Sequence, residues 1–176
     1  MRSLSGSGIV WLMGAWSSAE INAAFGDLDP GRRSAVEANL DAIDQLLRGV
    51  ASALDCGFQC RTYGSAPSSA WKGLQTELSA PRDIRNEDGT RSSGAFDAVM
   101  TIERVPNHDG RWLVWTYVAR NCNRLGCAED PHQGHHEEGQ ADSAMDASDL
   151  GLAMASRLVD WLGARTRSEL DYVVHQ

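Results

Sequence analysis

Two of the four cysteines and three of the five histidines of this chain fall within one short run, residues 122–136. Thiolate and imidazole are the side chains that bind zinc and similar metals best. Glycines at positions 126 and 134 would let the backbone turn tightly between such ligands. The run therefore predicts a metal site, with zinc as the expected ion. The candidate ligands are Cys122, Cys127, His132, His135 and His136.

A zinc ion held by three protein ligands would keep a fourth position open for an activated water. Glu137 or Glu138 would then act as general base, and Glu129 and Asp130 would orient the imidazoles. This interpretation is a metal-dependent enzyme centred on residues 122–138. The spacing of four residues between the cysteines differs from the two that zinc ribbons and knuckles use. A polar surface loop in which the histidines only titrate is the competing interpretation.

The other two cysteines, Cys56 and Cys60, allow a disulfide or thiol pair instead. On an extended strand these two lie too far apart to bond to each other. A predicted strand over residues 58–63 would neighbour the strand that ends at Cys122, which would bring Cys60 close to Cys122. Four cysteines, with Cys127 the fourth, permit three pairings and the sequence does not choose among them. In an oxidising compartment the cysteines would form disulfides, and the protein would then be a secreted, disulfide-stapled effector. The alternative is that the cysteines are buried free thiols.

Two helices are predicted ahead of these cysteines. Residues 18–26 suit a short helix ended by Gly26, and Asp29 followed by Pro30 is typical of a helix start. The helix from there to residue 54 carries apolar residues at steps of three and four, which form one stripe. We expect that stripe to pack within the domain, with a homodimeric helix pair as the alternative. The stripe consists of Val36, Leu40, Ile43, Leu47, Val50 and Leu54.

A β-hairpin over residues 95–121 is the next strong pattern, with turn chemistry at 106–110. Its second strand is apolar on both faces, so we expect it to be central and covered on both sides. The aromatic residues there are expected in the core, although Trp112, Trp115 and Tyr117 could also stack a ligand. A helix over 147–163, capped by Asp146 or Ser148, ends the fold.

These elements predict an α+β fold. An antiparallel or mixed sheet of about four strands would hold the hairpin at its centre, packed by the helices at 30–54 and 147–163. Residues 29–176 would form a single domain with long loops at 65–94 and 122–146, the first containing a short helix at 71–78. Residues 1–28 would form an N-terminal apolar arm and short helix. Trp11 and Trp16 of this arm either fill a groove on their own domain or anchor an interface.

The formal net charge of −8 leaves no basic excess for phosphate contacts, so no nucleic-acid partner is expected. No apolar run approaches the roughly 18 residues that a membrane span needs. The apolar patch at residues 9–16 faintly resembles a signal peptide, but a docked arm explains it better. A soluble protein of the cytoplasm or of a virion is favoured over a secreted one.

The element order, acidity and size resemble two families: the tail-terminator and head–tail connector proteins of bacteriophages, and the small acidic chaperones of type III secretion. Either resemblance implies work through protein–protein interfaces. The leading hypothesis is therefore a non-catalytic binding or assembly module, a homo-oligomer belonging to a phage particle or a secretion apparatus. The zinc-dependent enzyme and the disulfide-stapled effector are the alternatives.

Overall fold

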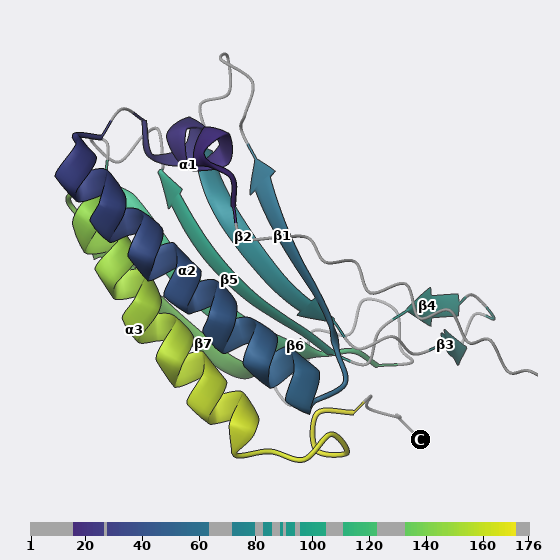
Figure 1. The fold of residues 1–176 in the computed structure, drawn as a ribbon. Coiled ribbons are helices and arrows are strands. Elements are labelled where there is room, and N and C mark those ends of the chain that lie inside the picture. Colours follow the sequence, from purple (N-terminus) through teal and green to yellow (C-terminus); the bar gives the residue numbers. More distant parts are fainter. Residues whose placement is uncertain are drawn as a thin grey trace, which may run out of the picture.

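In the computed structural model, three helices pack on a five-stranded antiparallel sheet (Figure 1). The structure describes residues 16–26, 28–63, 72–79, 83–85, 89, 91–93, 96–104, 111–122 and 133–171. The helices are α1 (Ser18–Phe25), α2 (Pro30–Ala53) and α3 (Ala144–Gly163). The strands are β1 (Gly57–Tyr63), β2 (Lys72–Ser79), β3 (Asp83–Arg85), β4 (Arg91–Ser93), β5 (Phe96–Arg104), β6 (Trp112–Arg120) and β7 (Gln133–Ala141). The α+β prediction is confirmed, with five strands in the main sheet in place of about four.

Local capping explains where the first two helices begin and end. The Ser17 hydroxyl accepts from the backbone N–H of Glu20, while the Glu20 carboxylate accepts from the backbone N–H of Ser17. Gly26 ends α1 at φ 76°, a conformation that glycine adopts most easily. Asp29 caps α2 by accepting from two backbone N–H groups at 3.1 and 3.0 Å. Both helix starts lie where the sequence predicts them.

The apolar stripe of α2 is buried along its length, from Val36 to Leu54. It packs against α3, which runs beside α2 on the same side of the sheet (Figure 1). Ser143 caps α3 by accepting from the backbone N–H of Asp146 at 3.1 Å, so the predicted caps, Asp146 and Ser148, are wrong. Ser148 is instead fully buried inside the helix, where its hydroxyl donates to a backbone carbonyl. The stripe is therefore used within the domain.

The sheet order is β1-β2-β5-β6-β7, and β3 and β4 pair separately. The predicted hairpin is present as β5 and β6, but β5 is the central strand. Along β6, burial alternates: Trp112 and Val114 are buried, whereas Trp115 and Tyr117 are partly exposed. The helices of the described chain all lie on one side of the sheet, so β6 is buried on that side and partly buried on the other (Figure 1).

Two predicted loops contain strands. The segment predicted as a helix at 71–78 is β2, whose Leu74, Thr76 and Leu78 alternate toward the core. Leucines four residues apart suit a helix face and a strand face equally, which explains the wrong prediction. β7 was predicted as part of a loop because it is polar throughout. An edge strand buries little on either face, so it lacks the apolar alternation that marks other strands.

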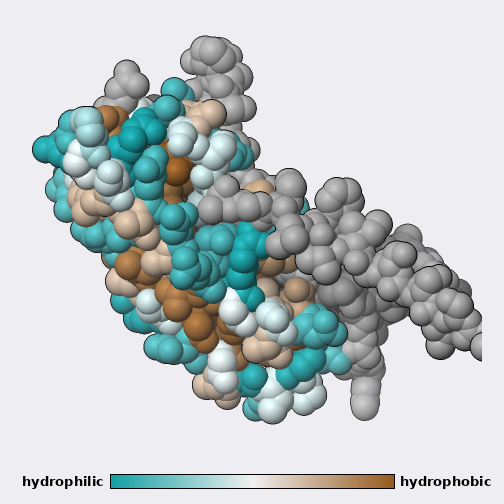
Figure 2. Space-filling model, viewed as in Figure 1, coloured by the Kyte–Doolittle hydropathy of each residue, from teal (hydrophilic) through white to brown (hydrophobic). Residues whose placement is uncertain are grey.

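The helix side of the molecule is mostly hydrophilic, with apolar residues gathered along the line where α2 and α3 meet (Figure 2). The partly exposed apolar side chains of these helices include Leu46, Leu152 and Val159. At one end of the same side, Phe25 of α1 stacks on Trp112 with ring centroids 4.7 Å apart. No helix in the described residues is long and apolar enough to cross a membrane.

Candidate functional site

The Cys/His run divides between two neighbouring strands. Cys122 lies just beyond the end of β6, and His135 and His136 lie in β7, which pairs with β6. Cys127 and His132 lie outside the described residues. The run is therefore the connection from β6 to β7, followed by the first half of β7 itself.

His135 points to the helix side of the sheet. Its Nε2 atom lies 3.1 Å from the hydroxyl of Thr116 on β6, and its ring centre lies 5.7 Å from that of Trp161 on α3. Burial lowers the pKa of His135 from its usual 6.5, and Glu137 offsets this only in part. The imidazole is therefore neutral at physiological pH and serves as a packed polar contact between strand and helix.

Trp161 fastens the start of β7 to α3. A side-chain carbon at Gly134 would lie 2.6 Å from the indole ring, so only glycine lets the strand approach this closely. Gly134 is also the extra residue of a β-bulge, because Val118 pairs with His135 and Ala119 pairs with Gln133. On the ring of Trp161, the Arg165 guanidinium stacks at 3.3 Å. These contacts set which residues of β7 face the helices.

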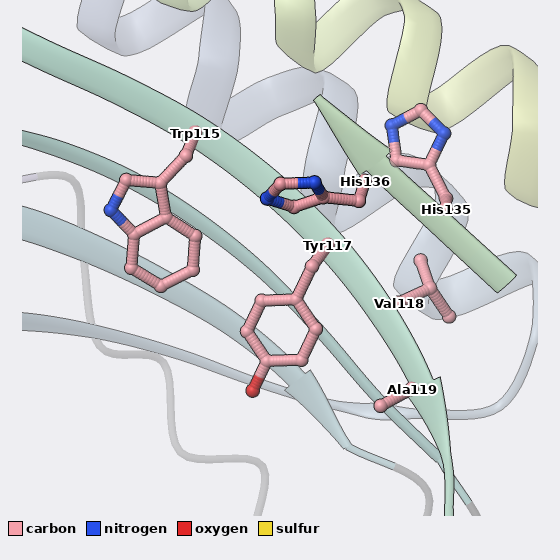
Figure 3. Close-up of a pocket in the computed structure, with 6 residues that line it drawn as sticks. All are labelled: Trp115, Tyr117, Val118, Ala119, His135 and His136. Carbon is pink, nitrogen blue, oxygen red and sulfur yellow. The ribbon is translucent and has the colours of Figure 1, made fainter. Parts of the chain in front are cut away.

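His136 points to the opposite side of the sheet, where it pairs with Tyr117 in register. Figure 3 shows the rings of Trp115, Tyr117 and His136 grouped together, with the His135 ring apart from them and nearer α3. A pocket of about 350 Å³ opens here. Its lining residues are Trp115, Tyr117, Val118, Ala119, His135 and His136.

The two large aromatic side chains of this pocket are held in place. The Trp115 and Tyr117 rings stack with centroids 5.6 Å apart and an interplanar angle of 20°. The indole N–H of Trp115 donates to the carboxylate of Glu103 at 3.0 Å, and Glu103 is buried on the central strand. Trp112 lies in the core, as expected, whereas Trp115 and Tyr117 are partly exposed, and the stacking of a ligand on them stays a prediction.

The five predicted metal ligands are not brought together by the described part of the chain. His135 and His136 leave β7 on opposite sides of the sheet, as neighbouring strand residues do. Among described residues, no group of three or more His, Cys, Asp or Glu side chains is arranged to hold an ion. A zinc site would therefore depend on Cys127 and His132, and it stays a prediction.

Cys56 and Cys60 carry thiols with separate partners. The Cys60 thiol donates to Asp44 of α2 at 3.7 Å, and burial followed by the charge of Asp44 raises its pKa to about 12. The Cys56 sulfur accepts from Arg167 at 3.1 Å, and burial raises its pKa as well. Strands β2 and β5 separate the strand of Cys60 from β6, so the predicted neighbourhood of Cys60 and Cys122 is absent.

Trp16 lies in the core of its own chain, 8% exposed, beside Ile21 and Phe25 of α1. This burial supports the first of the two roles considered for the arm, which is packing on its own domain. Trp11 lies outside the described residues. The interface role of these two tryptophans stays a prediction.

Sequence reasoning missed several residues that shape this region. Trp161, Arg165 and Gly134 join α3 to β7, and Glu103 holds Trp115. Among these residues only Glu103 left a signal in the sequence, as an acidic residue next to the last position of a mostly apolar strand. No protein-family model, curated protein or solved structure matches the chain.

Proposed function

We propose that the protein is a non-catalytic assembly module that forms homo-oligomers by pairing the β7 edge of its sheet with a second copy. The observation that carries this proposal is the position of β7 as the last strand of the described sheet, nine residues long and paired there with β6 alone. The outer edge of such a strand presents backbone N–H and C=O groups that can extend a sheet.

The side chains of β7 favour another copy as the partner. His136 and Glu138 are exposed on the same face, two residues apart. Residues that pair across two antiparallel strands lie on the same face of the sheet. When the two strands are copies of β7 related by a two-fold axis, one residue of β7 must therefore pair with the same residue of the other copy, and the axis passes between them. With the axis at Glu137, each His136 lies opposite Glu138 of the other copy. Two imidazole-to-carboxylate contacts then form on the exposed face.

The same register places the two Glu137 side chains opposite each other on the helix side. Each is already held by Arg157 of its own chain, whose guanidinium donates to the carboxylate at 2.8 Å. Paired residues would run from 135 to 139, which leaves the bulge at Gly134 outside. Charges and bulges on an edge discourage pairing with arbitrary strands. On β7 the charged residues would still allow pairing with a strand that carries the opposite charge at each facing position, as a second copy of β7 does at His136 and Glu138.

Light scattering on the full chain tests this function. We expect wild-type protein at about twice the 19.1 kDa monomer mass. His136→Glu turns two favourable contacts into two repulsive ones and should weaken the dimer by about 2 kcal/mol, roughly thirtyfold in dissociation constant. The double variant His136→Glu/Glu138→Arg restores opposite charges at both contacts and should recover the dimer. Gln140→Glu, a charge change outside the paired residues, is the control.

A wild-type monomer at high protein concentration would remove this proposal. So would a dimer that responds to His136→Glu and Gln140→Glu alike, because net charge would then explain both effects. A component of a phage particle or secretion apparatus lies within the proposal, supported by the element order and acidity. The light-scattering experiment tests only the pairing of the β7 edges, and not whether the protein belongs to a phage particle or to a secretion apparatus.

A further inference from the structure

The pocket beside Trp115 and Tyr117 has the chemistry of a site for a positively charged side chain. Indole and phenol rings attract cations through the negative potential of their faces. The Trp115 ring is fixed by its bond to Glu103, and the Tyr117 ring is fixed by its stack on Trp115. Both side chains are only partly buried, so their rings can be reached from outside.

A carboxylate stands next to these rings. Asp97 of β5 pairs in register with Ala119, which lines the pocket, and so lies on the same side of the sheet as Tyr117. The register also places Glu77 of β2 opposite Val99 and Val99 opposite Tyr117, and burial, then the charges of Asp97 and Glu77, raise the pKa of Tyr117. Asp97 accepts a hydrogen bond from the amide of Asn121 at 3.5 Å. Within the described part of the chain, no cation pairs with this half-buried carboxylate.

Guanidinium suits this environment better than ammonium does. It is planar, stacks on aromatic rings, is weakly hydrated and forms two parallel hydrogen bonds to a carboxylate. We propose that the pocket binds an arginine side chain of a partner protein, stacked on Tyr117 and Trp115 and paired with Asp97.

This proposal does not rest on the β7 dimer. Strand addition extends a sheet within its own plane and leaves its faces accessible. The charge-swap variants of β7 test the dimer by its molecular mass. Binding of the ligand is measured separately, from the NMR signal of Trp115 and from the effect of Asp97→Asn. Either proposal can therefore fail while the other stands.

The test is a titration of isotope-labelled full-length protein, followed by NMR at the indole N–H of Trp115. That resonance is assigned by its loss in Trp115→Phe. The probe is N-acetyl-arginine methylamide, which presents the side chain as it occurs within a polypeptide. We expect saturable shifts with a dissociation constant in the millimolar range, and about tenfold weaker binding of the neutral citrulline analogue.

Asp97→Asn should weaken binding of the arginine probe about tenfold, and Tyr117→Leu should weaken it by a similar factor. Asp41→Asn, on the exposed side of α2, makes the same change in net charge and should leave the affinity unchanged. The amide spectra of all variants report whether they fold. Equal binding of arginine and citrulline probes, or equal effects of Asp97→Asn and Asp41→Asn, would overturn the proposal. Much tighter binding of free arginine than of the blocked probe would also overturn it, because the ligand would then be a free amino acid.

Discussion

Cys60 and Asp44 form a partly buried contact that no pattern in the sequence predicts. Asp44 lies on α2, where it is only 7% exposed and also pairs with Arg48 at 2.7 Å. The position of β1 beside α2 brings the thiol of Cys60 to this carboxylate. The identity of a cysteine thus says little about its reactivity until its neighbours are known.

We predict that Cys60 reacts slowly with iodoacetamide in the folded protein. A pKa of about 12 lowers the thiolate fraction by about three orders of magnitude relative to a thiol of pKa 9.0. Asp44→Asn removes the second cause of this shift and leaves Arg48 nearby, so it should speed the labelling. Mass spectrometry of the Cys60 peptide after timed labelling measures the rate, with urea-unfolded protein as reference. Equal rates in folded and unfolded protein would contradict the prediction.

His135 should make the protein less stable as the pH falls. Its folded-state pKa is lowered by burial, with Glu137 opposing and His136, Arg157 and Arg165 reinforcing the shift. The unfolded chain takes up this proton near pH 6.5, whereas the folded protein takes it up at a lower pH. Between these two values the unfolded state binds more protons. The contribution of His135 is therefore fully present above pH 6.5 and declines below it.

Urea unfolding at pH 7.5 and pH 5 measures this effect. The free energy of unfolding should fall more between the two pH values in wild-type protein than in His135→Gln, which keeps a polar contact to Thr116. Identical pH dependence in wild type and His135→Gln would show that other groups are responsible.

At the scale of elements, helix ends were predictable because they depend on neighbours in sequence. Asp29, Pro30 and Gly26 act within their own turns, and the stripe of α2 follows from helical periodicity alone. β2 and β7 were missed for opposite reasons. The apolar residues of β2 fit a helix and a strand equally, and β7 has too few apolar residues to show any period.

Two helical glycines, Gly49 exposed on α2 and Gly151 buried on α3, should respond in opposite ways to alanine. Gly49 in α2 has open space around it, so Gly49→Ala should stabilise the protein by about 1 kcal/mol. In α3, a side-chain carbon at Gly151 would lie 2.7 Å from Ile102 of the sheet. Overpacking costs about 1–3 kcal/mol and outweighs the helical gain, so Gly151→Ala should destabilise by roughly 1 kcal/mol.

Urea denaturation of both alanine variants at one pH measures the difference directly. Stabilisation by Gly151→Ala equal to that by Gly49→Ala would mean that α3 can move away from the sheet at no cost. The comparison therefore tests how closely α3 packs on β5, and it needs no knowledge of function.

At the scale of the whole molecule, strand order and helix placement decide which side chains can act together. β2 and β5 lie between β1 and β6, which separates Cys60 from Cys122. Placement of α1, α2 and α3 on one side of the sheet leaves Trp115 and Tyr117 partly exposed on the other. Both proposed surfaces, the β7 edge and the aromatic pocket, follow from this arrangement.

The amino-acid sequence by itself determined the α+β class, the limits of α1 and α2, the buried stripe and the β5–β6 hairpin. Each depends on periodicity, capping or turn chemistry within a short stretch of chain. Only the tertiary structure decided that β7 closes the sheet, that His135 and His136 face opposite sides, and that Trp161 meets Gly134. These features come from contacts between segments far apart in sequence, and no local pattern encodes which segments will meet.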